Sequence, residues 1–393
     1  MGVKRRPVKF ERSPCLLISI NIKKRKLKNF KVFYLIALMA LLLGLGIFFL
    51  GYGSQSGSLF CAFFLFLSIG FRGSSKTRGY SFSVLIFGAV TFSLFYPQFL
   101  ISVGTFKLSA LIVPLLQILM FGMGTSMSFG DFKGVIKMPK GVFIGLVCQF
   151  TIMPFIGFGL ASVSGLSPEI AAGIILIGAA PSGLASNVMA YLANANLALS
   201  VTLTAVATLL SPLVTPLLMD LLAGQFIAID PLAMTWSIVK MVIIPIIAGL
   251  VFNHFFHGKV NWLDKAMPIL SMASIAVIIS IITASGRDSL LNVGLVLVTL
   301  AIAHNLSGYF LGYWGCRLFK MPEKDCRTIA LEVGMQNGGL ASGIALEMGK
   351  LSTVGLAPAI FGPWMNISGS SLATWWRDKP IIEKNIKLGK KTF

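Results

Sequence analysis

The chain has 393 residues, of which 56% are hydrophobic and 12% charged, and its mean hydropathy is +0.85. Soluble domains carry roughly 45–50% apolar and about 25% charged residues, so the composition excludes an ordinary soluble protein. The net charge of +20, from 33 Lys and Arg against 13 Asp and Glu, would suit nucleic-acid binding. The cations lie at the ends of apolar runs, however, where the charge bias of short loops explains them better. We therefore predict an integral membrane protein without a nucleic-acid partner.

Apolar runs long enough to span a bilayer recur along the chain. They predict an all-α polytopic membrane protein with twelve spans, near residues 33–50, 58–71, 81–97, 108–127, 141–163, 169–193, 196–219, 235–253, 267–284, 293–315, 326–348 and 355–376. The second span is short, and a re-entrant segment is the alternative. Residues 1–31 hold eleven Lys and Arg and one acid, and no A-x-A site follows the next apolar run. This segment is expected to be a retained cytosolic tail in contact with anionic lipid rather than a signal peptide.

Basic loops predict the orientation of the spans. With twelve crossings, one side of the membrane receives all the strongly basic segments, namely the N-terminal tail, residues 72–78, 133–140, Lys259 with Lys265, 317–327 and the tail after Arg377. The link on the opposite side carries Asp220 and Asp230. Both termini are therefore expected in the cytosol, with the protein in a bacterial inner (plasma) membrane.

The chain also repeats itself. The segment "SGLAS" begins at Ser182 and "GGLAS" begins at Gly338, an offset of 338 − 182 = 156 residues. The same offset maps the five spans from residue 81 onto the last five. An odd number of spans forces the second copy to be inverted, as in secondary transporters with sites on broken helices near the midplane. The predicted parts are a basic tail (1–31), an extra hydrophobic hairpin (32–80), two five-helix repeats (81–222 and 223–377) and a second basic tail (378–393).

Both matched segments interrupt a span. Pro181 and Gly183 fall within the first, and Gly334, Gly338 and Gly339 surround the second. Gly and Pro are frequent in membrane helices, so one break alone would mean little. Two breaks at equivalent positions, both with polar side chains, favour a binding site. Freed carbonyls with a carboxylate suit a small hard cation, and half-helix N-termini suit an anion.

Further oxygen donors lie in or near these breaks. Ser186 and Asn187 follow the first, and Glu332, Gln336 and Asn337 belong to the second. On the next span, Ser200 and Thr204 are four residues apart and share a helix face. Gln149 lies mid-span and needs either a neighbouring helix or an ion as its partner. His304 is a possible proton relay, although a hydrogen bond across helices is the commoner role of such a residue.

These segments resemble the bile acid:sodium symporter family. The resemblance rests on "PSGLASNVMAYLANANLALSV", "EVGMQNGGLASG" and "NISGSSLATWW", among others, and covers roughly residues 82–377. It implies ten helices in a core and a panel domain, with the fourth and ninth helices broken and crossing. It also implies that two Na⁺ ions drive the uptake of an organic anion. The N-terminal hairpin is not part of the familiar ten-helix core.

The resemblance also assigns residues. It implies a first sodium site of Ser186, Asn187, Ser200, Thr204 and Glu332, and a second of Gln149, Glu332, Gln336 and the backbone oxygens of Val333 and Met335. Asn337 would face the substrate, with Leu184 and Met365 nearby. Family members often have Thr in place of Leu184, and some have His in place of Met365. These departures leave the anion open among bile-acid-like, pantoate-like and keto acids.

Other functions remain as alternatives. Glu332 could couple transport to protons instead of sodium, and a passive anion channel or a membrane sensor would use a similar site. The sequence has no HExxH motif and no Ser/His/Asp set placed by motif, so we do not expect an enzyme.

Overall fold

The structure is a computed structural model that describes residues 14–74, 77–256 and 260–379. Parts of the predicted basic segments, at residues 1–13, 75–76 and 380–393 together with Lys259, lie outside the described residues. The described chain is mostly helical, and its one sheet is the short hairpin of β1 (Ser102–Val103) and β2 (Phe106–Lys107). The chain divides into two compact units, residues 1–88 and 89–393.

The first unit contains two long helices and half of a third. Its elements are α1 (Pro14–Phe49), α2 (Gly53–Phe71), η1 (Arg78–Tyr80) and the first half of α3 (Ser81–Phe95). The helix α1 begins well before the predicted span, but only Phe30–Phe49 of it is apolar enough to cross a membrane. The ring of Phe33 on α1 stacks on the ring of Phe66 on α2, with 6.2 Å between the ring centroids. Gly51, with φ of +91°, makes the turn between the two helices. At 19 residues, α2 is itself long enough to cross, which favours a full span over the re-entrant alternative.

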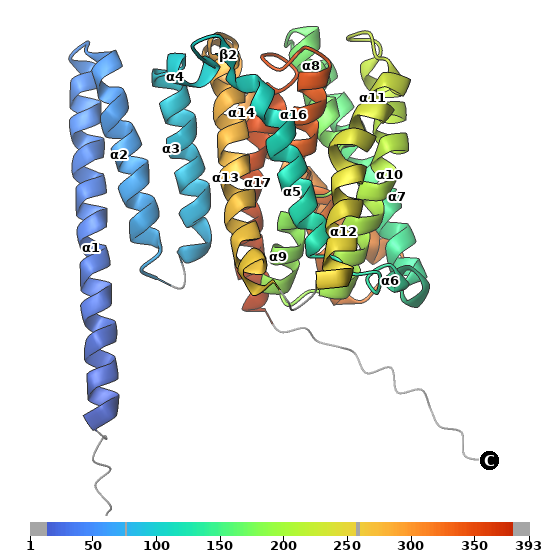
Figure 1. The fold of residues 1–393 in the computed structure, drawn as a ribbon, viewed down its shortest axis with the longest axis horizontal. Coiled ribbons are helices and arrows are strands. Elements are labelled where there is room, and N and C mark those ends of the chain that lie inside the picture. Colours follow the sequence, from blue (N-terminus) through green and yellow to red (C-terminus); the bar gives the residue numbers. More distant parts are fainter. Residues whose placement is uncertain (1–13, 75–76, 257–259, 380–393) are drawn as a thin grey trace, which may run out of the picture. The chain divides into compact units, whose positions relative to one another are not determined.

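The second unit holds the remaining helices (Figure 1). They are α4 (Gln98–Ile101), η2 (Leu108–Leu111), α5 (Ile112–Thr125), α6 (Lys133–Lys137), α7 (Pro139–Val163), α8 (Pro168–Ala179), α9 (Leu184–Leu192), α10 (Leu197–Ala223), α11 (Pro231–Ile238), the π-helical turn η3 (Val239–Ile243), α12 (Ile244–Phe256), α13 (Asn261–Ser285), α14 (Arg287–Leu318), α15 (Glu323–Gly334), α16 (Gly338–Glu347) and α17 (Leu356–Arg377). Apart from the early start of α1, each predicted span coincides, to within several residues at its ends, with one helix or with a consecutive run of helices.

Seven helices of the described chain are long and apolar enough to cross a membrane on their own. The chain is therefore a polytopic membrane protein. The two predicted spans at 169–193 and 326–348 are each divided into two short helices, α8 with α9 and α15 with α16. None of these four halves reaches the ~20 residues that a bilayer requires, so each span is completed only by its pair.

The helix α8 lies at the centre of the second unit. All its residues from Ile170 to Ala179 are buried, because the segment is apolar on every side and packs against α7, α10 and α17. In Figure 1, α8 lies near the upper end of this unit and α9 near the lower end, so the interruption between them falls in the interior.

Candidate functional site

The first interruption has a local cause in Pro181. A residue before proline is pushed out of the helical region, and Ala180 is extended, with φ of −71° and ψ of 151°. Gly183 is also extended, and α9 begins at the next residue, Leu184. The predicted break is therefore present, over Ala180–Gly183.

The second interruption follows Gly334, the last residue of α15. Met335 is extended, with φ of −112° and ψ of 95°, and α16 begins at Gly338. Gly334 allows a close approach, since a Cβ atom there would lie 2.2 Å from Cδ1 of Tyr309. Asn337 caps the new helix, with its Oδ1 accepting the amide of Leu340 at 3.0 Å.

The two interruptions cross and bond to each other. Ser182 and Gln336 form an isolated antiparallel bridge. The amide of Gly183 donates to the carbonyl of Met335 at 3.0 Å, and the amide of Asn337 donates to the carbonyl of Pro181 at 2.8 Å. Each break thus satisfies backbone groups of the other, as extended backbone at membrane depth requires.

The Glu332 carboxylate lies beside this crossing and is almost completely buried, with 2% of the residue exposed. Four hydroxyls donate to it, from Ser182 at 2.6 Å, Ser186 at 2.7 Å, Ser200 at 2.5 Å and Thr204 at 2.8 Å. These hydroxyls come from the first break, α9 and α10. The structure therefore gathers three of the predicted hydroxyl donors around the predicted carboxylate.

Three of these hydroxyls have more acceptors within reach than protons to give. Ser186 is also 2.7 Å from the carbonyl of Gly183. Ser200 and Thr204 are also 2.8 Å and 3.2 Å from Oδ1 of Asn187. A hydroxyl carries a single proton, so it can satisfy only one of two such acceptors at a time. The cluster is therefore rich in oxygen lone pairs and short of hydrogens.

A second polar cluster surrounds Gln149 of α7. Its Nε2 donates to Oε1 of Gln336 at 2.7 Å and to the carbonyl of Ala180 at 3.1 Å. Nε2 of Gln336 donates to the carbonyl of Val333 at 2.6 Å. Oε1 of Gln149 is buried without a hydrogen-bond partner, which is unusual for a buried amide oxygen. Among the described residues, the hydrogen bonds of Glu332 come from the hydroxyls, so they do not tie it directly to this second cluster.

The residues predicted near the substrate are divided between two places. Leu184 and Asn337 lie at the crossing, at the first turns of α9 and α16. Met365 is buried on α17, and its carbonyl accepts a hydrogen bond from the Tyr309 hydroxyl at 3.3 Å.

Sequence reasoning missed Ser182 and Asn305. Ser182 directly follows Pro181 within the predicted break, and this position could have identified its hydroxyl as a further oxygen donor of the site. Asn305 of α14 donates to the carbonyl of Gly334 at 2.7 Å and so supports the end of α15. Its neighbour His304 bonds to the carbonyl of Met153 on α7 at 2.9 Å, the cross-helix role expected for it.

Comparison with known proteins identifies a family of sodium-dependent transporters as similar to this chain. Residues 113–293 match the profile of the family described as the Sodium Bile acid symporter family. The chain is 42% identical over 311 residues to the uncharacterized sodium-dependent transporter YocS of Bacillus subtilis, covering 78% of this chain and 94% of that protein.

More distant relatives are matched over less of their length. A probable sodium/metabolite cotransporter of Arabidopsis thaliana chloroplasts, BASS1, is 34% identical over 262 residues, which cover 67% of this chain and 65% of that protein. The ileal sodium/bile acid cotransporter of Oryctolagus cuniculus is 34% identical over 247 residues, which cover 60% of this chain and 69% of that protein. The chain therefore belongs to the bile acid:sodium symporter family and is a membrane transporter, not an enzyme.

Proposed function

We propose that this chain is a sodium-coupled symporter that imports an organic anion by alternating access. The observation that carries the proposal is the shortage of protons around Glu332, where Ser186, Ser200 and Thr204 each face two acceptors. A small hard cation prefers oxygen ligands and would use the lone pairs that the hydroxyl protons leave unmatched. The sodium dependence named for the relatives supports the same reading.

Two ions would bind, one in each cluster. The first would use Ser186, Asn187, Ser200, Thr204 and Glu332. The second would use Gln149, Glu332, Gln336 and the backbone oxygens of Val333 and Met335. Oxygen donors of these types suit Na⁺, and the unpartnered Oε1 of Gln149 supports a ligand role for that residue.

The fold proposed for this mechanism is a ten-helix inverted repeat with core and panel domains. Its copies, residues 81–222 and 223–377, follow the hairpin (32–80), and the basic tails (1–31 and 378–393) would both lie in the cytosol. The position of the two breaks supports this division, since each falls in the fourth span of its copy.

The anion would bind where the breaks cross, facing Asn337, with Leu184 and Met365 as neighbours. Both α9 and α16 begin at the crossing, so the positive ends of two helix dipoles meet there. Both α8 and α15 end there, and their carbonyl ends favour cations. This opposition of charges supports binding of a cation and an anion side by side.

Replacing Glu332 with Gln tests the proposal. We expect Glu332→Gln to lower sodium-dependent uptake of labelled organic anions into proteoliposomes about a hundredfold. The substitution removes the negative charge of the carboxylate and one of the two oxygens that accept hydrogen bonds from the hydroxyls. The matched control is Glu347→Gln, which alters an exposed acid on the other half-helix, α16. Normal sodium-dependent uptake by a folded Glu332→Gln variant would refute the assignment.

Proton coupling through Glu332 is the alternative. A proton on Glu332 would supply one hydrogen to the first cluster, but it leaves Oε1 of Gln149 without a partner. Uptake that follows a pH gradient and ignores sodium would establish it. Accumulation of the anion against its gradient would exclude a passive channel and a sensor.

A further inference from the structure

A groove with one apolar and one cationic end lies between α14, α15 and α17, and Tyr309 in its lining packs against Gly334 at the end of α15. We call it the α14–α17 groove. It has a volume of about 510 Å³, and its lining includes Leu306, Phe310 and Trp314 of α14, Leu372 and Trp375 of α17, and Arg327 of α15. Leu184, Asn337 and Met365, the residues proposed to meet the transported anion, do not line it.

The apolar wall of the groove faces outward. Leu306, Phe310 and Trp314 are spaced four residues apart on one face of α14, and each is about half exposed. In a polytopic membrane protein, exposed apolar side chains of this kind face acyl chains. An occupant that enters from the bilayer would therefore lay hydrocarbon along this wall.

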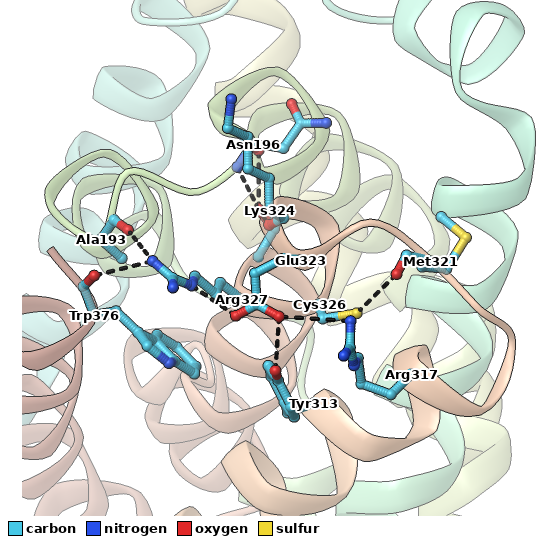
Figure 2. Close-up of polar contacts among 11 residues, drawn as sticks. Ala193, Asn196, Tyr313, Arg317, Met321, Glu323, Lys324, Cys326, Arg327 and Trp376 are labelled. Carbon is cyan, nitrogen blue, oxygen red and sulfur yellow. Dashed lines mark hydrogen bonds and ion pairs between the residues drawn. The ribbon is translucent and has the colours of Figure 1, made fainter. Parts of the chain in front are cut away.

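The opposite end of the groove is built around a buried cation, Arg327, whose side chain is 4% exposed. As Figure 2 shows, its guanidinium reaches the Glu323 carboxylate and two backbone carbonyls. Nε donates to Oε1 of Glu323 at 2.9 Å, and Nη1 donates to the carbonyls of Trp376 at 2.9 Å and Ala193 at 3.4 Å. The same Glu323 accepts the hydroxyl of Tyr313 at 2.7 Å. This end is therefore fixed in place by its own hydrogen bonds.

Two more cations surround this end. Arg317 lies 3.6 Å from Oε2 of Glu323, and Nζ of Lys379 lies 3.6 Å from the centre of the Trp375 ring. Arg327 and Arg317 pair with Glu323, and Lys379 lines the same groove, so this end holds three positive charges and one carboxylate, a balance of 3 − 1 = +2. Trp and cationic residues gathered at helix ends are typical of the membrane–water interface.

We propose that the α14–α17 groove binds an anionic phospholipid of the surrounding bilayer. Its phosphate lies near Lys379, Arg317 and Arg327, and an acyl chain lies along Leu306, Phe310 and Trp314. The charge selects an anionic head group, and the outward apolar wall selects a lipid over a soluble anion.

Native mass spectrometry of the full chain in detergent tests the proposal, with phosphatidylglycerol and phosphatidylcholine offered together. The groove variant, Arg317→Gln with Lys379→Gln, removes one exposed cation from each helix end. Because each interfacial cation contributes roughly fivefold to binding of an anionic lipid, we expect this variant, which lacks two, to bind phosphatidylglycerol about 25-fold more weakly. Wild-type protein should retain phosphatidylglycerol in preference to phosphatidylcholine.

A matched double variant controls for general attraction to charge. Lys320→Gln with Arg377→Gln also removes one cation from the end of α14 and one from the end of α17. Lys379 lines the groove and Arg317 pairs with its Glu323, whereas Lys320 and Arg377 neither line the groove nor pair with Glu323 among the described residues. It should retain phosphatidylglycerol as the wild type does. Equal loss in both variants, or equal retention of the two lipids by the wild type, would overturn the proposal. Glycerol 3-phosphate, a head group without acyl chains, should not compete; if it displaces the lipid at millimolar concentration, the groove is a soluble-anion site instead.

Discussion

The hydroxyl of Ser182 differs from the others around Glu332 because it comes from the break itself. It donates to Oε2 at 2.6 Å, directly beside the bridge to Gln336. Ser182 therefore links the shape of the crossing to the charge of the first cluster.

Removing this hydroxyl should weaken the first cluster without emptying it of ligands. We expect Ser182→Ala to raise the sodium concentration for half-maximal uptake about tenfold, as loss of one hydrogen bond to a charged group implies. Ser211→Ala is the control, since that buried hydroxyl on α10 bonds only to the carbonyl of Thr208 in its own helix, at 2.8 Å. An unchanged sodium dependence in Ser182→Ala would contradict this role.

Gln149 provides a separate test of the second ion. We expect Gln149→Leu to lower the Hill coefficient for sodium from about 2 towards 1, because one of two coupled ions would lose a ligand. Initial uptake rates over a sodium series measure this. Thr151→Ala, on the exposed side of the same helix, should leave the coefficient unchanged. A normal coefficient in Gln149→Leu would remove the support for a second ion at this place.

The sequence predicts the residue types of the site better than their contacts. The oxygen donors Ser200 and Thr204 could be paired by helical spacing, and both reach Glu332 as a pair. The contact between Asn305 and the carbonyl of Gly334 could not be predicted, because it depends on how α14 packs against the end of α15. The periodicity of apolar residues predicts local secondary structure, but it does not predict contacts between residues far apart in the sequence.

At the scale of elements, the end of α15 depends on close packing with α14. A Cβ atom on Gly334 would meet the Tyr309 ring at 2.2 Å. We expect Gly334→Ala to destabilise the protein by about 1–3 kcal/mol, since the ring or the break must shift. Thermal unfolding in detergent measures the change.

Gly294→Ala, on α14, is the control for this substitution. Its Cβ would meet only the side chain of Leu290, at an ordinary 3.5 Å. There the better helix propensity of Ala should leave stability unchanged or raise it by up to about 1 kcal/mol. Equal melting temperatures for Gly334→Ala and the wild type would show that the packing at Tyr309 tolerates the extra carbon.

Element boundaries followed from the sequence where a proline or a glycine marks them. Pro181 predicted the interruption that follows α8, and Gly334, Gly338 and Gly339 predicted the interruption between α15 and α16. The start of α1 at Pro14 was not predicted, because the predicted span counted only apolar residues, whereas a helix can continue through a basic segment outside the hydrocarbon.

At the scale of the whole molecule, contacts within the second unit indicate which of its loops lie on the same side of the membrane. Asn196, at the start of α10, donates to Asp325 at 2.8 Å, so α10 begins on the side of the loop that joins α14 to α15. The 27 residues of α10 then extend about 40 Å, so they end on the opposite side.

This geometry predicts opposite accessibility for two exposed loops. With the five native cysteines replaced, we expect Lys320→Cys to react with a membrane-impermeant maleimide only after permeabilisation of cells. Gln225→Cys, just beyond α10, should react in intact cells. The physical reason is the excess of Lys and Arg near residue 320, which favours the cytosol. The reverse pattern would invert the proposed orientation of both termini.

The hydrogen bonds across the crossing also limit how the protein can move. Separating the breaks would leave the amides of Gly183 and Asn337 without acceptors. In hydrocarbon each such loss costs several kcal/mol, far more than sliding apolar helix faces past one another. On the proposed mechanism, the two breaks therefore travel as one rigid piece. The spacing of the ligands is conserved through the transport cycle, and only the side of the membrane to which they are open changes.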